Sequence, residues 1–598
     1  MADADNQVEQ ERQLLAEAKT KGPIGRYGIY FRLSGPGWIA SAITLGGGSL
    51  ASSLYLGVLG GYSLLWLQPL AMVMGVIMLS AIGYVTLSSG EKPFRAINEH
   101  VSPVLGWGWA LAVAAANIIW CMPQHSLANA VLSQNLLPSF LGKDKTLSNW
   151  AANTFGDSTA TTSWLSVHAD ELAVSLVILV FCTIITWSYD RGGWGLRLYE
   201  VVLKIVVAII VLCFMGVVIM LTISTEPLDW DAIFRGLVPD FGQFWRPADT
   251  FGPLLDAIGP AGSAAREFWV AKIVAEQRDV MISAVATAMG INMTLMFPYT
   301  MLRKGWTKEF RGLAIFDLST GMFIPYVLAT GFVVIASASQ FHGKLPDGFS
   351  EVKRADGSVK IVVDEKSLKF VDYSKLIALR DTTLAKNEAT SAEREDRDPR
   401  AVATVTDSEK RLAGMLVKRD AMDLSASLAP LTGKPIANIV FGLGVLAMVI
   451  STISILMLIS GFVFAEMTGF PPGGKMHKAG TLVAGVGGAM WPLLWEGESK
   501  FYLAVVTSVF GFMLLPFAYV TFVLLMNSKS LLKDEMPRGG RRFLWNVLTG
   551  VSATVATVGA VYMIWVKARY LGIAAVALFV LLAGMVAIHR MNERKQRS

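Results

Sequence analysis

The chain has 598 residues, of which 53% are hydrophobic and only 16% are charged, whereas about 25% of the residues of a soluble domain are charged. Together with a mean hydropathy of +0.49, this composition excludes a soluble enzyme and indicates an integral membrane protein. The net charge of +6 arises in connections between apolar stretches, so we expect membrane lipid, and no nucleic acid, as a partner.

The predicted membrane spans begin after a polar N-terminal segment. Residues 1–33 contain no apolar core and are expected to form a cytoplasmic tail. From Gly35 onward, about twelve apolar stretches approach the 20 residues that a helix needs to cross the hydrocarbon. They are residues 36–57, 63–88, 104–136, 171–188, 198–222, 279–300, 313–339, 435–466, 478–494, 501–526, 543–566 and 569–589.

Basic residues beside these spans predict the orientation. If the N-terminus is cytoplasmic, the connections after the sixth and tenth spans and the C-terminal tail, 591–598, are cytoplasmic too. These three regions are strongly basic, as cytoplasmic loops are; the bases are Arg303, Lys304, Lys308, Arg311, Lys529, Lys533, Arg538, Arg541, Arg542, Arg590, Arg594, Lys595 and Arg597. We therefore expect a multi-pass plasma-membrane protein with both termini in the cytoplasm.

A polar insertion separates the first seven spans, within 34–343, from the last five, within 421–590. Residues 344–420 hold 31 of the chain's 98 Lys, Arg, Asp and Glu residues, so this segment is predicted to be an extracytoplasmic cover or a ligand-capturing module. A β-hairpin turned at Asp356-Gly357 and a solvated charge run at 393–400 are expected within it.

A second outer insertion is predicted at 245–278. Its apolar sequence is interrupted by Asp256, Arg266, Glu267 and Lys272. Interfacial helices fit this pattern, and a short re-entrant pair is the alternative.

Two spans carry signals for interruption. Three consecutive glycines, Gly46, Gly47 and Gly48, precede Ser49, and each glycine lowers helix propensity by about 1 kcal/mol relative to alanine. In the sixth span Pro298 removes an amide donor, so unwinding is expected just before it. Broken helices facing each other at the midplane form substrate sites in many secondary transporters, although glycines also serve close helix packing. We expect Asn292, Thr294, Phe297, Tyr299 and Thr300 to line the sixth-span side.

No enzyme, resident metal or cofactor is predicted. The six histidines are scattered without an HExxH motif, and the three cysteines, Cys121, Cys182 and Cys213, lie inside apolar runs. The glycine triplet lacks the Lys-Ser/Thr that a phosphate-binding loop requires.

Several stretches resemble the NRAMP divalent-metal transporters. They are GPGWIASAITLGGGSLASSLYLGVLGGYSLLWL at 35–67, DWDAIFRGLVPDF at 229–241, LAPLTGKPIANIVFGLGVLA at 428–447 and LLPFAYVTFVLLMNSKSLL at 514–532. The resemblance implies a LeuT-type fold, with two inverted five-helix repeats plus two extra helices, and alternating access. The two outer insertions do not belong to the usual pattern of this family.

The residues differ from the family where its metal is bound. The resemblance places an Asp-Pro-Gly-Asn of the family at Gly46 to Ser49, and an Ala-x-x-Met-Pro-His at Thr294, Phe297, Pro298 and Tyr299. A glutamine of the tenth span becomes Leu514, and an acidic pair associated with proton passage becomes Pro123 and Ser126. Transition metals need soft or basic donors and countercharge, which these replacements do not supply.

Other polar residues are candidates for a pathway. Gln124 and His125 either face the pathway or form hydrogen bonds between helices. Ser451, Thr452 and Ser454 either line it or bond to their own backbone, which is the commoner arrangement.

The sequence therefore predicts an NRAMP-related secondary transporter in which the transition-metal site is lost. An anion or a small polar solute is the expected substrate. Two alternatives stay open: transport of a divalent cation, above all hydrated Mg²⁺, and a non-transporting receptor or scaffold that binds a partner through 344–420. The sequence leaves the oligomeric state undetermined.

Overall fold

The computed structural model describes residues 2–143, 146–155, 160–189, 205, 208–209, 211–212, 214–223, 228–355, 359–367, 369–392, 404–420, 423, 425, 433–495 and 499–597. Nearly all regular structure within them is helical. The described strands, β1 (Phe349–Lys353) and β2 (Val359–Val363), pair antiparallel with Phe349 opposite Val363. The hairpin predicted in the insertion is thus confirmed, while its turn at 356–358 and the charge run at 393–400 lie outside the described residues.

Eight helices in the described part of the chain are long and apolar enough to span a membrane, or nine if one bent pair is a single span. The bent pair is α3 (Pro36–Thr44) and α4 (Gly47–Gly60). The others are α5 (Leu67–Ser89), α7 (Pro103–Val131), α9 (Ala160–Tyr189), α13 (Ala264–Ala288) with α14 (Met293–Arg303), α15 (Arg311–Asp317) with α16 (Ile324–Phe341), α21 (Lys434–Thr468), α23 (Leu503–Met513) with α24 (Leu515–Met526), and α26 (Gly539–Arg597).

Three of the twelve predicted stretches do not add to the number of candidate spans. In the stretch 198–222, residues 198–204, 206–207, 210 and 213 lie outside the described residues. The stretch 478–494 forms α22 (Lys475–Ala489), whose 15 residues give a length of about 22 Å, less than the hydrocarbon thickness. The last two predicted spans are both within α26, which is divided at Arg569 by a non-helical backbone (φ 47°, ψ −133°).

The predicted outer insertion at 245–278 is helical in the structure. It contains a short 3-10 helix (Asp249–Phe251), α12 (Gly252–Ile258) and the first part of α13, which runs without interruption from Ala264 to Ala288. Its charged residues are accommodated because they are paired: Arg266 lies 3.1 Å from Asp256, and Lys272 lies 3.1 Å from Glu276.

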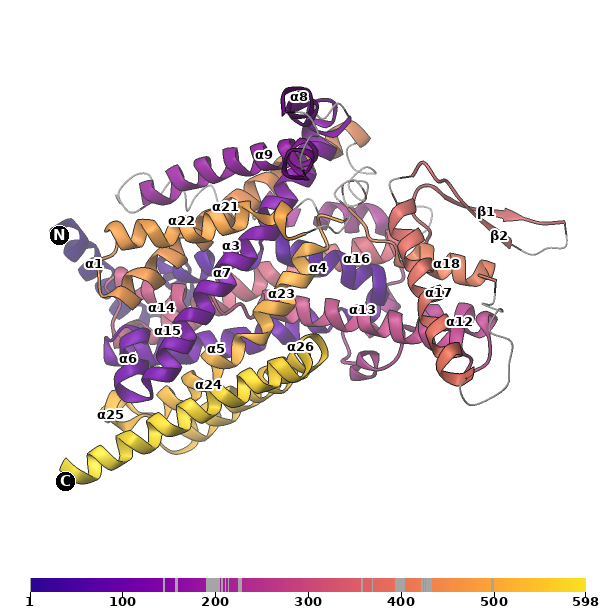
Figure 1. The fold of residues 1–598 in the computed structure, drawn as a ribbon. Coiled ribbons are helices and arrows are strands. Elements are labelled where there is room, and N and C mark those ends of the chain that lie inside the picture. The colour runs from indigo at the N-terminus through magenta and orange to yellow at the C-terminus, as the bar shows by residue number, and fades with distance from the viewer. Residues whose placement is uncertain are drawn as a thin grey trace.

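Shorter helices cover the two ends of the bundle. They are α1 (Ala2–Thr20), α2 (Pro23–Leu33), α6 (Pro93–His100), α8 (Thr146–Phe155), α11 (Trp230–Arg235), α17 (Phe370–Ala392), α18 (Asp407–Leu416) and α25 (Lys529–Leu532). Figure 1 shows both termini at one end, near α15 and α25, and the insertion with β1, β2, α17 and α18 at the other. The termini thus lie on one side, as predicted; that this side is cytoplasmic stays a prediction.

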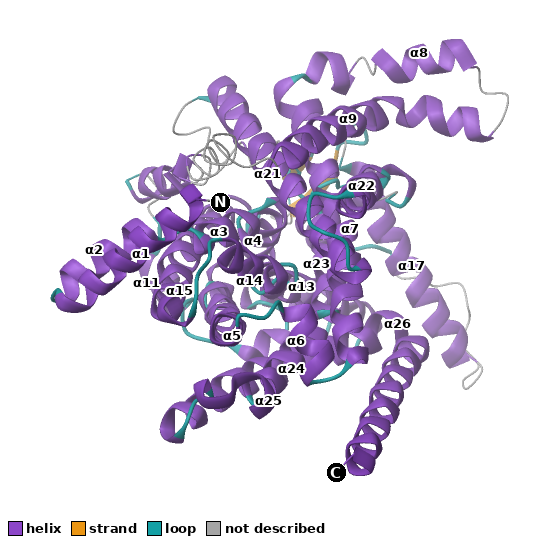
Figure 2. Cartoon of the chain, turned by 90° about the vertical axis from the view of Figure 1, so that its left-hand side faces the viewer, coloured by secondary structure: helices purple, strands orange, loops and turns teal. Residues whose placement is uncertain are grey.

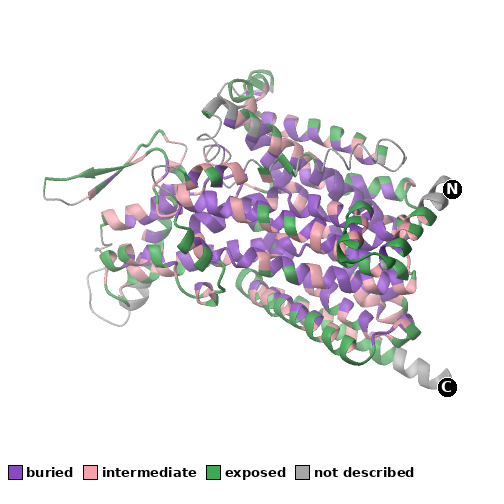
Figure 3. Ribbon diagram, turned by 180° about the vertical axis from the view of Figure 1, so that it is seen from behind, coloured by how far each residue is buried: buried purple, intermediate pink, exposed green. Residues whose placement is uncertain are grey.

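The burial pattern fits a lipid environment. Seen from the end that carries the termini, α3, α4, α13 and α14 lie near the centre, and α9 and α26 lie at the periphery (Figure 2). Buried residues concentrate in the central helices, whereas α26 is largely exposed (Figure 3). Because α26 is also highly apolar, we expect lipid to cover it.

The N-terminal start of α3 is fixed by a buried carboxylate. Asp317, at the end of α15, accepts hydrogen bonds from the backbone amides of Gly35 (3.3 Å) and Gly37 (2.6 Å) and from the Ser34 hydroxyl. These amides open α3 and have no partner within that helix. Asp317 therefore acts as a cap supplied from another helix.

Close packing of α4 on α16 depends on one glycine. A Cβ at Gly57 would lie 2.0 Å from Ser337 Oγ and 2.6 Å from the Val334 carbonyl oxygen. We expect Gly57→Ala to lower the free energy of unfolding by about 1–3 kcal/mol through overpacking. Thermal unfolding in detergent measures this. Gly331→Ala on α16 is the control, because a Cβ there meets open space; equal stability of the two variants would contradict the packing argument.

Candidate functional site: a neutral cavity between broken helices

The break in the first span lies at the glycine triplet. Leu45 and Gly46 separate α3 from α4, and the two helix axes are bent by 53°. Gly46 is extended (φ −72°, ψ 177°) and opens α4. The Ser49 amide donates to the Gly46 carbonyl at 3.1 Å, while the Gly47 and Gly48 amides have no backbone acceptor among the described residues, as is usual at a helix start. The expected discontinuity of this span is observed.

The sixth span is interrupted earlier than predicted. The gap runs from Met289 to Asn292, and Pro298 lies inside α14. The side-chain oxygen of Asn292 accepts from the Met293 amide at 2.9 Å and so caps α14, which explains why the helix restarts there. The expectation that Pro298 sets the interruption is therefore wrong.

A small cavity of about 50 Å³ lies between these interruptions. Five parts of the fold contribute its walls: the α3/α4 break, α7, the α13/α14 break, α21 and α23. The lining residues are Ile43, Thr44, Gly46, Gly48, Ser49, Trp120, Pro123, Gln124, Ala286, Thr287, Gly290, Asn292, Met293, Thr452, Leu456 and Ser508. None of them is ionisable.

Hydroxyls and amides give the cavity its polarity. Thr287 donates to the Ala284 carbonyl (3.0 Å) and Thr452 to the Met448 carbonyl (2.9 Å), so their oxygen lone pairs are left to accept. Gln124 is buried, and its Oε1 has no hydrogen-bond partner among the described residues. The cavity thus offers neutral acceptors beside the helix-opening amides of α4.

The structure brings together only part of the predicted site. Gly46, Gly48, Ser49, Asn292 and Gln124 line the cavity. A Cβ at Gly47 would instead lie 2.3 Å from Leu127 Cδ1 and 2.9 Å from Gln124 Oε1, so Gly47 permits the approach of α7.

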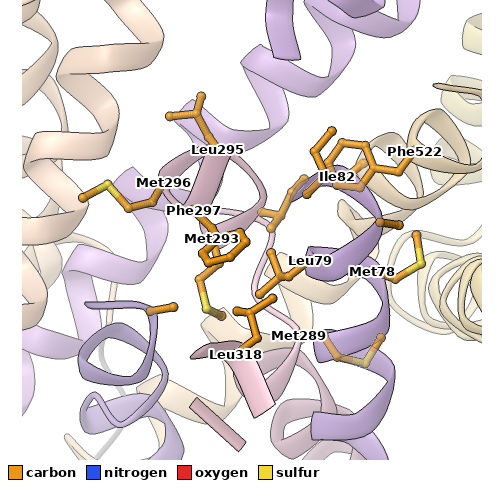
Figure 4. Close-up of a cluster of buried hydrophobic side chains, with 14 of the residues drawn as sticks. Met78, Leu79, Ile82, Met289, Met293, Leu295, Met296, Phe297, Leu318 and Phe522 are labelled. Atoms are coloured by element: carbon orange, nitrogen blue, oxygen red, sulfur yellow. The ribbon is translucent and has the colours of Figure 1, made fainter. Parts of the chain in front are cut away.

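The other predicted residues of the sixth span lie elsewhere. Thr294 accepts from the Trp109 indole at 3.0 Å, and Phe297 packs in a buried apolar cluster with Leu79 and Ile82 (Figure 4). Tyr299 and Thr300 line a separate hollow of about 370 Å³ beside Lys92 and Arg303. These four residues lie away from the cavity because the helix breaks before Met293, so that all of them are part of α14.

Of the other predicted pathway residues, Thr452 lines the cavity, whereas His125, Ser451 and Ser454 lie outside its lining. His125 is fully buried on α7, beside Gly488. Ser451 and Ser454 donate to the carbonyls of Met448 (2.7 Å) and Ile450 (2.8 Å) in their own helix.

Sequence inspection missed several lining residues, namely Thr44, Trp120, Thr287, Met293 and Ser508. A single hydroxyl residue within an apolar helix does not by itself indicate that it lines a cavity. Met293 adds one thioether, which also belongs to the apolar cluster of Figure 4.

The insertion contacts three of the helices that form the cavity. Lys418 Nζ lies 2.6 Å from the Glu276 carboxylate on α13 and 4.0 Å from the ring centroid of Tyr502, which precedes α23. Tyr55 on α4 donates to the Arg419 carbonyl at 2.6 Å. One short segment of the insertion therefore joins α4, α13 and α23.

Asp420 gives the insertion a pH-dependent stability. Burial raises the pKa of Asp420 from 3.8 to about 6, and the neighbouring Asp423 carboxylate adds to the rise. Because the folded-state pKa exceeds the unfolded one, stability is lost as the pH rises through 6 and gained as it falls towards 4. We expect thermal unfolding and hydrogen exchange of 407–420 to show this slope between pH 7.5 and 5, and Asp420→Asn to reduce it. Burial also raises the pKa of Asp372, which would add to the pH dependence of the wild type. The test is therefore the difference in slope between Asp420→Asn and wild type, and identical slopes would contradict the assignment of the pH dependence to Asp420.

Comparisons with known proteins agree with this architecture. Two solved structures of a manganese transporter from Eremococcus coleocola, one of a histidine-to-alanine mutant and one of a complex with an aromatic bis-isothiourea compound, superpose with a TM-score of 0.58 at 12% identity. The alignments cover 96% of each chain for the mutant and 97% for the complex. The fold is that of a LeuT-type membrane transporter.

The family follows from the sequence match. The model of the natural resistance-associated macrophage protein-like family matches residues 37–365 and 402–566, and the chain belongs to this family. The unmatched stretch between the two segments lies within the insertion. No curated protein matches the chain.

Proposed function

We propose that this chain is a secondary transporter of a small polar solute, anionic or neutral, which binds in the cavity between the two broken helices. The observation that carries the proposal is the chemistry of the lining: hydroxyls, amides and glycine backbone, with no ionisable side chain among the lining residues. A solute that needs hydrogen bonds but no countercharge suits such walls.

A dehydrated transition metal fits this lining poorly. Such ions are held by imidazole, thiolate, thioether or carboxylate ligands, and a dication in a low-dielectric cavity needs opposite charge nearby. Met293 is the one lining residue with a soft donor. A single thioether without countercharge leaves most of the dehydration cost of the ion uncompensated.

Helix geometry favours a polar or anionic guest. The Gly47 and Gly48 amides at the start of α4 have no backbone acceptor among the described residues, and the positive end of the helix dipole lies there. Gly46, Gly48 and Ser49 of this turn all line the cavity. Half-helix N-termini serve this purpose in other secondary transporters.

Hydrated Mg²⁺ is the second candidate. The free Gln124 Oε1 and the Thr287 and Thr452 oxygens are acceptors suited to the ion's water ligands, since magnesium keeps several waters when bound. A volume of about 50 Å³, however, holds only a few waters. A compact solute therefore fits the observed cavity better.

Transport by the purified full chain in proteoliposomes tests the proposal. We expect uptake of bicarbonate, formate or urea, assayed with and without a proton gradient, and no appreciable Mn²⁺ flux. Robust Mn²⁺ flux would overturn the argument from ligand chemistry, and Mg²⁺ flux alone would select the second candidate. Absence of all flux, with a partner binding to 344–420, would favour the receptor or scaffold.

The location of the site is tested at Gly48. A Cβ there meets only Thr287 Cγ2 at 3.4 Å and Ser508 Oγ at 3.7 Å, so Gly48→Ala places a methyl group in the cavity without a clash. Crowding of the substrate by about 1–3 kcal/mol lowers transport roughly five-fold or more, while thermal stability stays at the wild-type value. Gly444→Ala on α21 is the matched control because its Cβ meets open space. Equal uptake by both variants would place the substrate elsewhere.

A further inference from the structure

A groove outside the central cavity opens at the end that carries the two termini. It encloses about 970 Å³ between α5, α15 and the beginning of α26. α5 also packs against α13, but none of the residues that line the groove lines the central cavity. The groove therefore faces the surroundings of the spans and takes no part in the proposed substrate site.

The three helices that wall the groove share one polarity gradient. On α26 the lining passes from Arg541 to Leu544 and Leu548, and on α15 it passes from Arg311 to Ile315. On α5, which runs in the opposite direction, it passes from Tyr84 through Ser80 to Val76. At 1.5 Å per residue, each change from polar to apolar takes about 6–12 Å, which matches the passage from headgroup to acyl chain at one face of a bilayer.

The arginines at the rim of the groove differ in their pairing. Arg311 is held by Glu535 at 2.8 Å, and Lys308 contacts the same carboxylate at 2.9 Å. Arg538 has only a 3.8 Å contact with Asp534, in which both side chains are largely exposed. Arg541 is exposed, and no carboxylate pairs with it in the described part of the chain. Two guanidinium groups are thus available to an anion.

A buried hydroxyl lies between the charged rim and the apolar floor. Ser80 is only 5% exposed, lines the groove, and its Oγ has no hydrogen-bond partner among the described residues. A buried hydroxyl without a partner is costly. The carbonyl oxygen of a lipid ester at this depth would accept a hydrogen bond from the Ser80 hydroxyl.

We propose that this groove binds one anionic phospholipid, with its phosphate at Arg538 and Arg541, its glycerol ester at Ser80, and an acyl chain along Val76, Ile315 and Leu548. Arginine forms forked, charge-assisted hydrogen bonds to phosphate oxygens. Basic pockets between spans on the cytoplasmic side bind anionic headgroups by the same means. A headgroup with an amine suits the rim less well, because its cation would lie beside the arginines.

Binding is tested on the full-length protein after delipidation in a neutral detergent. Phosphatidylglycerol and phosphatidylcholine are added separately, and bound lipid is measured by native mass spectrometry alongside the thermal unfolding temperature. We expect one tightly bound phosphatidylglycerol and a larger increase of the unfolding temperature than with phosphatidylcholine. Each base near a charged lipid contributes roughly a five-fold gain in affinity, so R538Q/R541Q should weaken phosphatidylglycerol binding roughly twenty-five-fold.

The matched control is K475Q/K529Q, which removes the same charge from exposed residues that do not line the groove; it should bind like wild type. Ser80→Ala should weaken both lipids equally, since the ester is common to them. Equal affinity of wild type for the two lipids, or equal loss in both double variants, would overturn the proposal. Displacement of the lipid by glycerol phosphate at equal concentration would also overturn it, because the ligand would then be a soluble phosphate.

Discussion

The interruption of spanning helices inside a bilayer is the constraint on which the rest of this structure depends. Backbone groups released there have no water from the hydrocarbon to pair with, and each unsatisfied group costs several kcal/mol. The α3/α4 break meets this demand locally: the Gly46 amide donates to the Ile43 carbonyl at 3.1 Å, and the Ser49 hydroxyl donates to the Thr44 carbonyl. Asn292 caps the restart of α14. The Gly47 and Gly48 amides and the polar cavity walls remain for a guest.

Charge is distributed around this neutral centre in a regular way. Asp317 holds the N-terminal start of α3, and Lys418 and Glu276 connect the insertion to α13. Between these ends the cavity lining carries no ionisable group. The family relationship therefore accounts for the architecture, while the lining residues decide which chemistry the centre can support, because a shared fold does not fix a shared ligand.

The outer surface of the bundle is shaped by contact with lipid. The apolar surface of α26 requires lipid simply because it is apolar, but the groove beside its first turns combines exposed arginines with a buried unpaired hydroxyl. The groove arginines, Arg311, Arg538 and Arg541, belong to segments at one end of the bundle. Both termini lie at this same end (Figure 1). The proposed lipid groove and the proposed substrate cavity thus involve different residues and are separable by experiment.

Composition and apolar run length alone determined the membrane class, the approximate spans and the polar insertion, since the length of a spanning helix is set by the bilayer. The glycine triplet located the first break because helix propensity is a local property. The second break could not be located in the same way: Pro298 is tolerated inside α14, whereas α13 ends at Ala288 and Asn292 caps the start of α14. Likewise, only tertiary packing brought Thr287, Thr452 and Ser508 to one cavity from three helices and turned Thr294 and Phe297 into core residues. Which face of an all-apolar helix meets the cavity depends on its neighbours, because periodicity carries no signal when every face is buried in lipid or protein.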